Sequence, residues 1–366
     1  GEAERASSIL FNKLSQKYNM IMLTLQDSKI DYDLEGISLS LKENDMSIFF
    51  KFLNFFKIYF FIRLAKIYKI IKSNNIDVII SIRDYSNLLI IILKIIFNLK
   101  TPLIGSIHTN PMRKNALFSL LILFFYNLKS LDKVHCVSKD IKTILINNFK
   151  IDKKKLCVIY NFVDFEKINY LKIKPLDKKK KIFSNPDILK YINVGRLEDV
   201  KGHKYLIKAF SIVNKKIPNS HLFIVGDGPL LKNLKAEAKK FNMEKNISFL
   251  GFQKNPFKYL FKSDIFVLSS LFEGLPVVLL EALACRLPII STNCKTGPRE
   301  ILENGKYGFL TRVKEVEDMA EKMFLLGSNR DLRLKYSQIS FERAKFFKVE
   351  ILIKKWKNLI EEFEIY

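Results

Sequence analysis

Cysteine, histidine and arginine are all scarce in this chain of 366 residues. The cysteines show no metal-ligand spacing, and a chain of this length does not depend on disulfide bonds, so we expect reduced thiols in a cytoplasmic protein. The histidines are too scattered to predict a metal site. These residues are Cys136, Cys157, Cys285, Cys294, His108, His135, His203 and His221. We therefore expect neither a metal ion nor a cofactor.

The net charge of the chain is +25, and the scarcity of arginine helps to decide which kind of partner this charge indicates. Only 11 of the 62 basic residues are arginines, whereas proteins that read nucleic acids rely on arginine forks. The many lysines occur together with many Ile, Asn and Phe residues, a mixture that an AT-rich codon bias produces. We expect no nucleic-acid partner, which leaves an anionic membrane surface or an anionic ligand to explain the remaining charge.

No uncharged apolar run is long enough to cross a membrane. The longest one covers residues 115–128, whereas a spanning helix needs about 20 residues, so we expect a buried helix there. No signal peptide is recognisable. The first residues look like the loop and helix that follow a first strand, and we expect a short strand to be missing upstream.

Apolar segments with strand character alternate with helical patterns along the whole chain. This alternation predicts an α/β fold with parallel sheets, and the length predicts two domains. We predict a Rossmann-like domain over 1–170, a linker over 171–187, a second Rossmann-like domain over 188–340, and a C-terminal helix over 341–366 that packs toward the first domain. Strands are expected at 19–25, 76–81, 101–108, 132–138, 156–160, 191–194, 221–225, 247–250, 265–269, 288–291 and 308–310.

Two carboxylates, Glu273 and Glu281, give the strongest chemical signal. They flank the turn Gly274-Leu275-Pro276, which opens an apolar helix. Gly274 lets the backbone approach a ligand, and the free N–H groups at a helix start suit a diphosphate. Glu281, two turns into the helix, is placed to accept hydrogen bonds from ribose hydroxyls. The alternative is a capping Glu273 and a solvated Glu281, which the apolar neighbours of Glu281 disfavour.

Two cations follow another predicted strand. Gly195 ends that strand, and Arg196 and Lys201 come next, with Lys201 directly before Gly202. Ligands bind at the carboxyl ends of strands in open α/β sheets. An arginine fork and a lysine ammonium would neutralise a diphosphate leaving group while its bond breaks. The alternative is a pair of solvated cations in a lysine-rich chain.

Two further segments end predicted strands. The segment Gly226-Asp227-Gly228-Pro229 matches only the start of a GxGxxG motif, so a tight turn beside a nucleotide fits as well as a dinucleotide site. His108 ends a strand in the first half of the chain. It is placed to donate a hydrogen bond to a sugar hydroxyl or to a developing charge, and the alternative is an ordinary polar loop residue.

In their order and spacing, these motifs resemble family 4 retaining glycosyltransferases of the GT-B fold. The resemblance covers essentially the whole chain and is most specific in the second half. It implies two Rossmann-like domains with parallel sheets that face each other across a cleft. It also implies a metal-independent transfer in which the leaving diphosphate helps to deprotonate the incoming hydroxyl. The matching residues are Arg196, Lys201, Gly202, Gly226–Pro229, Gly251, Phe252, 272–284 and 297–301.

The resemblance also implies roles for single residues. Arg196 and Lys201 would hold the donor diphosphate, Glu281 the ribose, and Glu273 the donor sugar, and His108 would lie beside the transferred sugar. His108, Glu273, Arg196 and Lys201 form the expected catalytic set. Further donor-binding residues would be Gly1, Gly226, Gly228, Gly251, Phe252, Gly274, Leu275 and Pro276. Gly1 begins a stretch that matches a glycine-rich loop of the family, with Glu2 in place of its second glycine. The block at 296–300 looks like members that transfer galactose or N-acetylgalactosamine.

A basic and apolar segment extends from Ile48 to Lys72. It carries six cations, no acids and many Phe, Ile and Leu residues. The cation spacing keeps the charges broadly on one side of a helix, which is typical of an interfacial helix on anionic lipid. The alternative is an ordinary half-buried helix. We predict a peripheral protein on the cytoplasmic face of the inner membrane.

Together these features predict a retaining hexosyltransferase. It would move a hexose or N-acetylhexosamine from a nucleotide sugar, with UDP the expected nucleotide, to a lipid-linked or glycan acceptor in bacterial polysaccharide or lipopolysaccharide assembly. Sugar-nucleotide epimerases and phosphorylases share the fold and are the alternative. A basic nucleic-acid-binding protein is a distant alternative, because the sequence has no RNP motif or zinc finger.

Overall fold

The computed structural model describes residues 2–25, 37–40, 55–113, 116–176 and 181–363, and the chain divides into two compact units. The N-unit comprises Ala3–Ile159 together with Ile353–Tyr366. The C-unit comprises Tyr160–Leu352 together with Glu2, the described residue of the segment Gly1–Glu2. The divisions therefore lie after residues 159 and 352, whereas the sequence-based division has them at 170 and 340.

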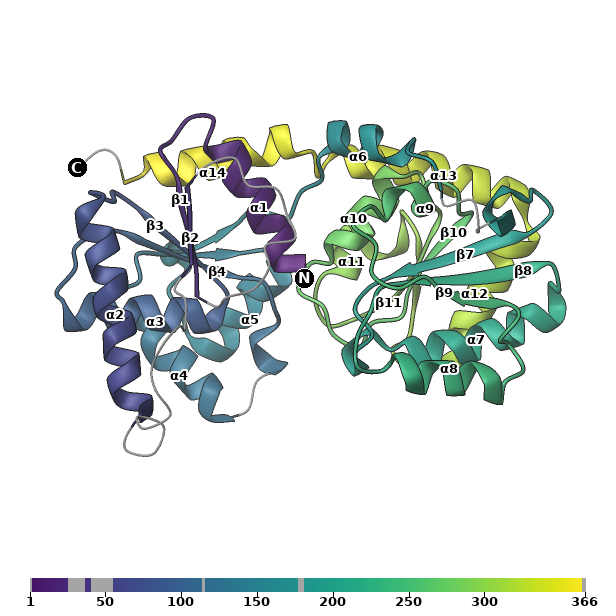
Figure 1. Ribbon diagram of the computed structural model, residues 1–366, viewed down its shortest axis with the longest axis horizontal. Helices are drawn as coiled ribbons and strands as arrows, with labels where there is room; N and C mark the ends of the chain where they lie inside the picture. Colours follow the sequence, from purple (N-terminus) through teal and green to yellow (C-terminus); the bar gives the residue numbers. More distant parts are fainter. Residues whose placement is uncertain (1, 26–36, 41–54, 114–115, 177–180, 364–366) are drawn as a thin grey trace. The chain divides into compact units, whose positions relative to one another are not determined.

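The N-unit contains two parallel sheets (Figure 1). The larger one has the order β3-β4-β5-β6, and β1 pairs with β2 in the other. The strands are β1 (Ile21–Thr24), β2 (Ile37–Ser40), β3 (Ile79–Ile82), β4 (Leu103–Ile107), β5 (Lys133–Cys136) and β6 (Leu156–Val158). The helices are α1 (Glu2–Leu14), α2 (Phe55–Ser73), α3 (Asp84–Ile96), α4 (Ala116–Asn127), α5 (Lys139–Phe149) and most of α14 (Val349–Glu361), with 3-10 turns at Pro111–Arg113 and Lys153–Lys155.

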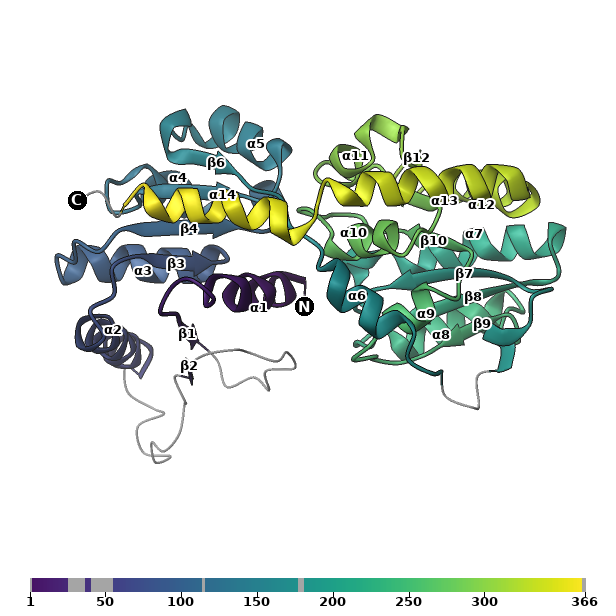
Figure 2. The same ribbon diagram turned by 90° about the horizontal axis from the view of Figure 1, so that it is seen from above.

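Helices cover both faces of the larger N-unit sheet. In Figure 1, α1 and α14 lie on one side of the strands, and α3 and α5 lie on the other. Figure 2 shows α1 and α14 running beside each other, and Lys17, after α1, forms an ion pair with Glu361 of α14. Every residue of β4 is buried as a result. This two-sided burial explains why the strand is apolar over nearly its whole length.

The C-unit is built on one six-stranded parallel sheet. Its strands are β7 (Leu189–Val194), β8 (Ser220–Val225), β9 (Ile247–Phe249), β10 (Ile265–Leu268), β11 (Ile289–Thr292) and β12 (Phe309–Thr311). Its helices are α6 (Phe165–Lys172), α7 (His203–Lys216), α8 (Leu231–Lys240), α9 (Phe257–Leu260), α10 (Val277–Ala284), α11 (Pro298–Ile301), α12 (Val316–Ser328) and α13 (Arg330–Lys345), with 3-10 helices η4 (Lys181–Ser184), η5 (Asp199–Lys201) and η6 (Glu303–Gly305). Figure 1 shows α7, α8 and α12 on one side of the sheet and α9, α10 and α13 on the other.

The strand order of the C-unit predicts where a ligand crevice lies. The order β9-β8-β7-β10-β11-β12 reads 3-2-1-4-5-6 when the strands are counted along the unit. This is the doubly wound order, in which the chain starts at the centre, runs to one edge and then returns to build the other half. The switch point lies between β7 and β10, and a crevice is expected outside their carboxyl ends. The predicted α/β fold with two parallel-sheet units is confirmed.

The predicted linker takes part in the core of the C-unit. Residues 177–180 lie outside the described residues, but η4 follows them directly. Phe183 of η4 is buried and stacks on Phe223 of β8, with 3.9 Å between the ring centroids. The described part of this segment therefore packs as part of the C-unit.

The helix expected to be buried at 115–128 is not buried. In α4, the side chains of Ile122 and Tyr126 are buried, whereas Leu120, Leu121 and Phe124 are exposed. The prediction of a buried helix is therefore wrong for the described part of α4. A helix that is apolar all round carries no periodic signal that says which side faces the core.

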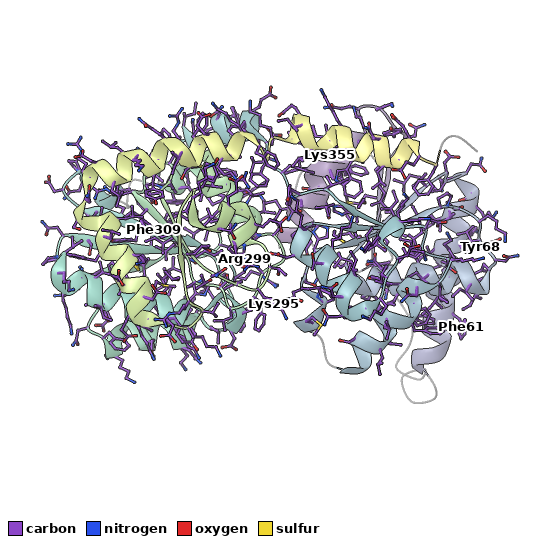
Figure 3. All side chains as sticks on the ribbon, turned by 180° about the vertical axis from the view of Figure 1, so that it is seen from behind. Phe61, Tyr68, Lys295, Arg299, Phe309 and Lys355 are labelled. Carbon is purple, nitrogen blue, oxygen red and sulfur yellow. The ribbon has the colours of Figure 1, made fainter. Side chains whose placement is uncertain are left out.

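The basic segment at 48–72 forms a half-buried helix where it is described. Residues 48–54 lie outside the described residues, and α2 covers the rest. Leu64 and Ile67 are buried, and Tyr68 stacks on Phe97 with 4.5 Å between the ring centroids. Phe61, labelled with Tyr68 in Figure 3, is exposed. Among the described helices, none is long and apolar enough to cross a bilayer.

Candidate functional site

Four strand-to-helix connections come together at the carboxyl ends of the C-unit strands. They follow β7, β8, β10 and β11 and cover residues 195–202, 226–230, 269–276 and 293–297. Because β7 and β10 are neighbours at the switch point, the first and third connections meet there. These connections contain most of the donor-binding residues that the sequence predicts in the C-unit.

The two cation and carboxylate motifs meet in one ion pair. Lys201 Nζ lies 2.8 Å from Glu273 Oε1, and the two side chains are exposed by only 13% and 6%. The residues are 72 positions apart in the chain. A second contact joins the same connections, because the Ser269 hydroxyl donates a hydrogen bond to the Lys201 carbonyl at 2.8 Å. The position and charge of Lys201 therefore depend on Glu273, and those of Glu273 depend on Lys201.

Arg196 differs from Lys201 in its surroundings. Its side chain is 64% exposed and pairs with Glu198 at 3.0 Å between Nη2 and Oε2. An exposed ion pair of this kind contributes little to folding stability. Arg196 is therefore accessible to a ligand at small structural cost.

The glycine turn after β8 packs on the connection that contains Arg196. Gly226 has a φ of 140°, and a Cβ there would collide with the carbonyl oxygen of Gly195. The Leu197 N–H also donates to the Asp227 carbonyl at 2.9 Å. The Gly226 N–H donates to the Gly251 carbonyl at 2.9 Å. These contacts explain the segment as a close-packed turn, one of the two alternatives left open by the sequence.

The turn that contains Glu273 is supported from the connection after β11. The Thr296 hydroxyl donates to the Glu273 carbonyl. Gly297 has a φ of 93°, and a Cβ there would lie 2.7 Å from the carbonyl oxygen of Gly274. The block at 296–300 thus has a structural role beside the carboxylate, which the sequence analysis did not predict.

The start of α10 has no side-chain cap from the residue before it. Pro276 precedes the helix and forms no cap hydrogen bond with its side chain, and the turn itself is buried. Asn161 donates from Nδ2 to the Leu275 carbonyl at 2.7 Å and so holds the turn in place. Glu281 lies on this helix and is buried. Asn161 was missed because no local pattern links it to a turn more than a hundred residues away.

Gly251 and Phe252 follow β9 and sit beside the glycine turn. Gly251 forms an isolated antiparallel bridge with Gly226. The Phe252 ring is 61% exposed. An exposed ring next to a nucleotide-type turn can stack on a base. Gly1, the remaining predicted donor-binding residue, lies outside the described residues.

His108 belongs to the N-unit and follows β4. Its Nε2 lies 2.9 Å from Ser106 Oγ, and Ser106 Oγ lies 2.6 Å from His135 Nδ1. Burial lowers the pKa of His108 to about 4 and that of His135 to about 3. The sequence analysis missed Ser106 and His135. The available signals were a polar residue two positions before His108, on the same strand face, and a histidine inside an apolar strand.

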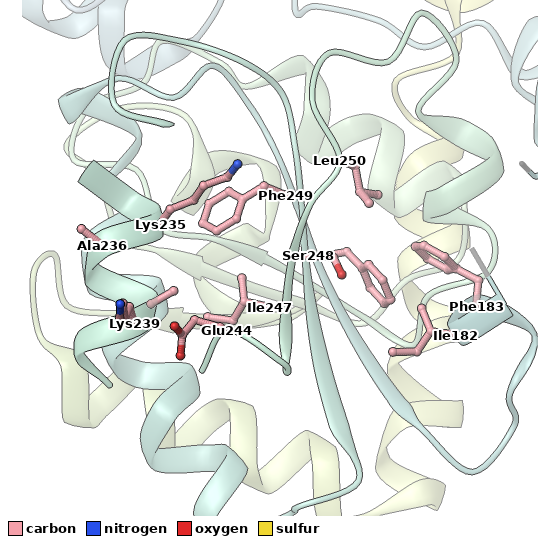
Figure 4. Close-up of a pocket in the computed structure, with 12 residues that line it drawn as sticks. Ile182, Phe183, Lys235, Ala236, Lys239, Glu244, Ile247, Ser248, Phe249 and Leu250 are labelled. Atoms are coloured by element: carbon pink, nitrogen blue, oxygen red, sulfur yellow. The ribbon is translucent and has the colours of Figure 1, made fainter. Parts of the chain in front are cut away.

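A surface cavity of about 640 Å³ lies elsewhere on the C-unit, around the edge strand β9. Figure 4 shows Lys235 and Lys239 of α8 on one side of the strand and Ile182 and Phe183 on the other. None of the sequence-predicted site residues lines this cavity. It is therefore separate from the candidate donor site. No group of three or more His, Cys, Asp or Glu side chains suited to a metal ion occurs in the described part of the chain.

Comparisons with known proteins identify the family of this chain. Residues 20–167 match the model described as Glycosyltransferase Family 4, and residues 175–343 match the model described as Glycosyl transferases group 1. The chain is also 38% identical over 338 residues to an uncharacterized glycosyltransferase of Methanocaldococcus jannaschii, with 82% of each chain covered. The chain belongs to the family 4 glycosyltransferases. It is an enzyme of this class, and the epimerase, phosphorylase and nucleic-acid-binding alternatives are wrong.

Two further comparisons bear on this glycosyltransferase. It is 30% identical to the N-acetylgalactosamine-N,N'-diacetylbacillosaminyl-diphospho-undecaprenol 4-alpha-N-acetylgalactosaminyltransferase of Campylobacter jejuni, with 98% of this chain and 96% of the relative covered. Its fold is similar to that of Anabaena HepE in complex with UDP and glucose, with a TM-score of 0.80, 18% identity, and 99% and 96% of the chains covered. The GT-B fold class is thereby confirmed.

Proposed function

We propose that this glycosyltransferase moves N-acetylgalactosamine or a related hexose from a UDP-linked donor to a lipid-diphosphate-linked acceptor, with retention of the anomeric configuration. The observation that carries the proposal is the buried Lys201–Glu273 pair at the switch point, beside the uncapped start of α10. The name of the Campylobacter relative supports the sugar and the acceptor class. The UDP in the Anabaena structure supports the nucleotide.

The donor diphosphate would lie against the start of α10. Free N–H groups and the positive end of the helix dipole favour an anion there. An ammonium has three N–H donors, so Lys201 can hold Glu273 and contact the diphosphate at the same time. Arg196 is exposed and would add a planar fork to the same group. Both cations would stabilise the charge that develops as the sugar leaves.

The nucleoside would extend from the diphosphate along the C-unit. Glu281 is buried in the same helix and would accept hydrogen bonds from the ribose hydroxyls. The exposed Phe252 would stack on the base beside Gly251. Glu273 pairs with Lys201 through Oε1, and its other carboxylate oxygen would contact the transferred sugar. A diphosphate oxygen would then take the proton of the incoming hydroxyl on the face that the diphosphate leaves.

The melting temperature of the protein with UDP, GDP or ADP tests the donor site. At about 100 times the dissociation constant, a nucleotide adds about 2.7 kcal/mol of stability. We expect a shift with UDP that disappears in Glu281→Ala. Glu244→Ala is the control, because Glu244 is an exposed acid that lines the separate cavity. A UDP shift that survives in Glu281→Ala but is lost in Glu244→Ala would place the nucleotide in the cavity instead.

The transfer reaction itself tests the chemistry. We expect the purified protein to consume UDP-N-acetylgalactosamine only when a lipid-diphosphate-linked saccharide is present. The anomeric coupling constant of the product, read by NMR, should match that of the donor sugar. An inverted product would contradict the retaining mechanism and leave the donor site standing.

We also propose that the N-unit binds an anionic membrane through α2 and α4. Both helices flank α3 (Figures 1 and 2), and their exposed side chains include Phe61, Ile62, Leu120 and Phe124. Residues 60–73 of α2 add four cations and no acid. Apolar side chains next to cations suit the interface of an anionic bilayer, which would place the enzyme on the cytoplasmic leaflet beside a lipid-linked acceptor.

Sedimentation with liposomes tests this surface. The wild-type chain should sediment with phosphatidylglycerol vesicles at physiological salt and much less with phosphatidylcholine vesicles. The double variant Leu120→Asp/Phe124→Asp should lose this binding, whereas Ile173→Asp should keep it, because Ile173 is equally exposed but belongs to the C-unit. Equal binding by both variants would contradict the proposed surface.

A further inference from the structure

Two hydrogen-bonded side chains, Ser106 and His135, connect His108 to the interior of the N-unit. Ser106 and His135 are directly opposite each other on the paired strands β4 and β5. His108 Nε2 lies 2.9 Å from Ser106 Oγ, and His135 Nδ1 lies 2.6 Å from the same oxygen. His135 Nε2 lies 2.7 Å from the carbonyl oxygen of Ile159, at the inner end of the series.

The direction of every hydrogen bond in this series follows from its inner end. The Ile159 carbonyl can only accept, so His135 Nε2 carries a hydrogen. A neutral imidazole has one N–H, and His135 Nδ1 therefore accepts from the Ser106 hydroxyl. That hydroxyl has no second hydrogen, so its oxygen accepts from His108 Nε2–H. The unprotonated nitrogen of His108 is then Nδ1.

This assignment requires both imidazoles to be neutral. His135 is buried and packs on Trp356 of α14 with 4.4 Å between ring centroids. Burial, with repulsion from His108, lowers the pKa of His135 to about 3. Burial also lowers the pKa of His108 to about 4, and the nearby Glu4 and Arg83 act on it in opposite directions and pair with each other at 3.0 Å. Both histidines are therefore neutral at pH 7.

We propose that Ser106 and His135 are positioning residues that fix His108 as the Nε2–H tautomer, so that His108 Nδ1 accepts a hydrogen bond from a substrate hydroxyl. The contact with substrate rests on the proposed function, whereas the tautomer does not. The hydrogen bond thus runs in the opposite direction to the sequence-based expectation that His108 donates.

The fixed tautomer has a consequence for the substrate. An unprotonated nitrogen in a neutral ring accepts from a hydroxyl, but it gives nothing to a carboxylate, which has no hydrogen to donate at pH 7. An acceptor that faces a carboxylate in a site closed to water would leave both groups unsatisfied. The site therefore suits a sugar that carries a hydroxyl at this position and disfavours a uronic acid.

The test is a ¹⁵N NMR spectrum of the full chain with labelled histidine, without any ligand. The chemical shifts of Nδ1 and Nε2 distinguish the two neutral tautomers and the cation. We expect the Nε2–H pattern for His108 and His135 at pH 7, with no protonation of either ring down to pH 5.5. A Nδ1–H pattern for His108, or titration near pH 6.5, would overturn the proposal. The wild-type spectrum decides this even if a variant does not fold.

The variant His135→Phe tests whether His135 sets the tautomer of His108. A phenyl ring of similar size cannot accept from Ser106, so the hydroxyl would turn to His108 Nε2 to keep its hydrogen bonded. We expect His108 to switch to the Nδ1–H pattern. His221→Phe is the matched control, because His221 is a buried histidine that bonds a serine, Ser248, in the C-unit. An unchanged His108 spectrum in His135→Phe would show that the series does not set the tautomer.

Measurements of UDP affinity and of sugar transfer distinguish a failure of this proposal from a failure of the proposed function. In His135→Phe, the affinity for UDP should be unchanged, because UDP lacks the sugar hydroxyl, whereas kcat/KM for transfer should fall about tenfold, the discrimination expected for one hydrogen bond. A wild-type chain that transfers no sugar would contradict the proposed function and leave the tautomer result intact. A switched tautomer with unchanged transfer would show that His108 does not contact the substrate in the way proposed.

Discussion

The Lys201–Glu273 pair gives a prediction that separates folding from catalysis. Lys201→Met removes the ammonium and leaves a carboxylate that is only 6% exposed. Removing one partner of a buried ion pair costs about 3–5 kcal/mol, and the residual exposure of both groups puts this pair near the lower end, at about 3 kcal/mol. For a unit of this size, about 3 kcal/mol lowers the melting temperature by roughly 6–12 °C.

A second substitution should restore the fold without restoring the reaction. Replacing both charges, in Lys201→Met/Glu273→Gln, leaves no buried charge and should bring stability back to within about 1 kcal/mol of the wild type. Transfer should remain low in the double variant, because the diphosphate still lacks its ammonium, at a cost of about 2–4 kcal/mol in transition-state stabilisation. Lys215→Met is the matched control, since Lys215 is exposed at the end of α7.

Calorimetry and initial transfer rates decide between the outcomes. A double variant as unstable as Lys201→Met would show that the ion pair is not the source of the destabilisation. A double variant that regains transfer would show that Lys201 supports the fold only, and the diphosphate assignment would be wrong. Arg196→Met adds an independent check, because its exposed pair with Glu198 predicts unchanged stability together with slower transfer.

Three further results are expected. Gly226→Ala should abolish the UDP-dependent melting shift, because its Cβ collides with the Gly195 carbonyl. Gly305→Ala shares the strain of a positive φ but has open space at its Cβ, so it should be destabilised less and should keep the shift, and equal behaviour of the two variants would refute the packing argument. Because burial lowers the pKa of His135 from 6.5 to about 3, its contribution to stability is present above pH 6.5 and is lost as the pH falls. In urea unfolding followed by Trp356 emission, the wild type should therefore lose about 1 kcal/mol more between pH 7 and pH 5.5 than His135→Phe, which keeps the other buried histidines, and an equal loss would contradict the neutral ring. Transfer should continue in the presence of EDTA, and its loss would contradict the sequence-based expectation of a metal-independent reaction.

The sequence predicted what depends on neighbouring residues. Strand ends followed by Gly, Pro and charged residues marked the connections at 195–202 and 269–276, and both lie where the sheet topology puts a crevice. Alternation of strands and helices was enough to predict two parallel-sheet units. α12 was not predicted, although its buried Met319, Ala320, Met323 and Leu326 follow a readable helical spacing.

The sequence could not predict contacts between distant residues. Nothing local indicates that Lys201 and Glu273 share one ion pair, or that Thr296 supports the same turn. The exposed face of α4 was missed for a different reason, since a helix without charged residues and with apolar residues on every side gives little sign of which side is solvated. Such features become visible only when the strand order and the packing partners are known.

Lys201 and His108, the two functional groups with the clearest surroundings, are positioned in the same way. Each follows a strand, and each is paired with a buried polar side chain: Lys201 with the carboxylate of Glu273 in one unit, and His108 with the Ser106–His135 series in the other. A buried polar side chain destabilises the fold unless it forms its hydrogen bond or ion pair, so removing one member of either arrangement also destabilises the protein. Loss of transfer in a variant of such a partner therefore says nothing about catalysis by itself. Only a second variant that restores the fold, or a spectrum that reports the protonated nitrogen, can separate the two effects in this enzyme.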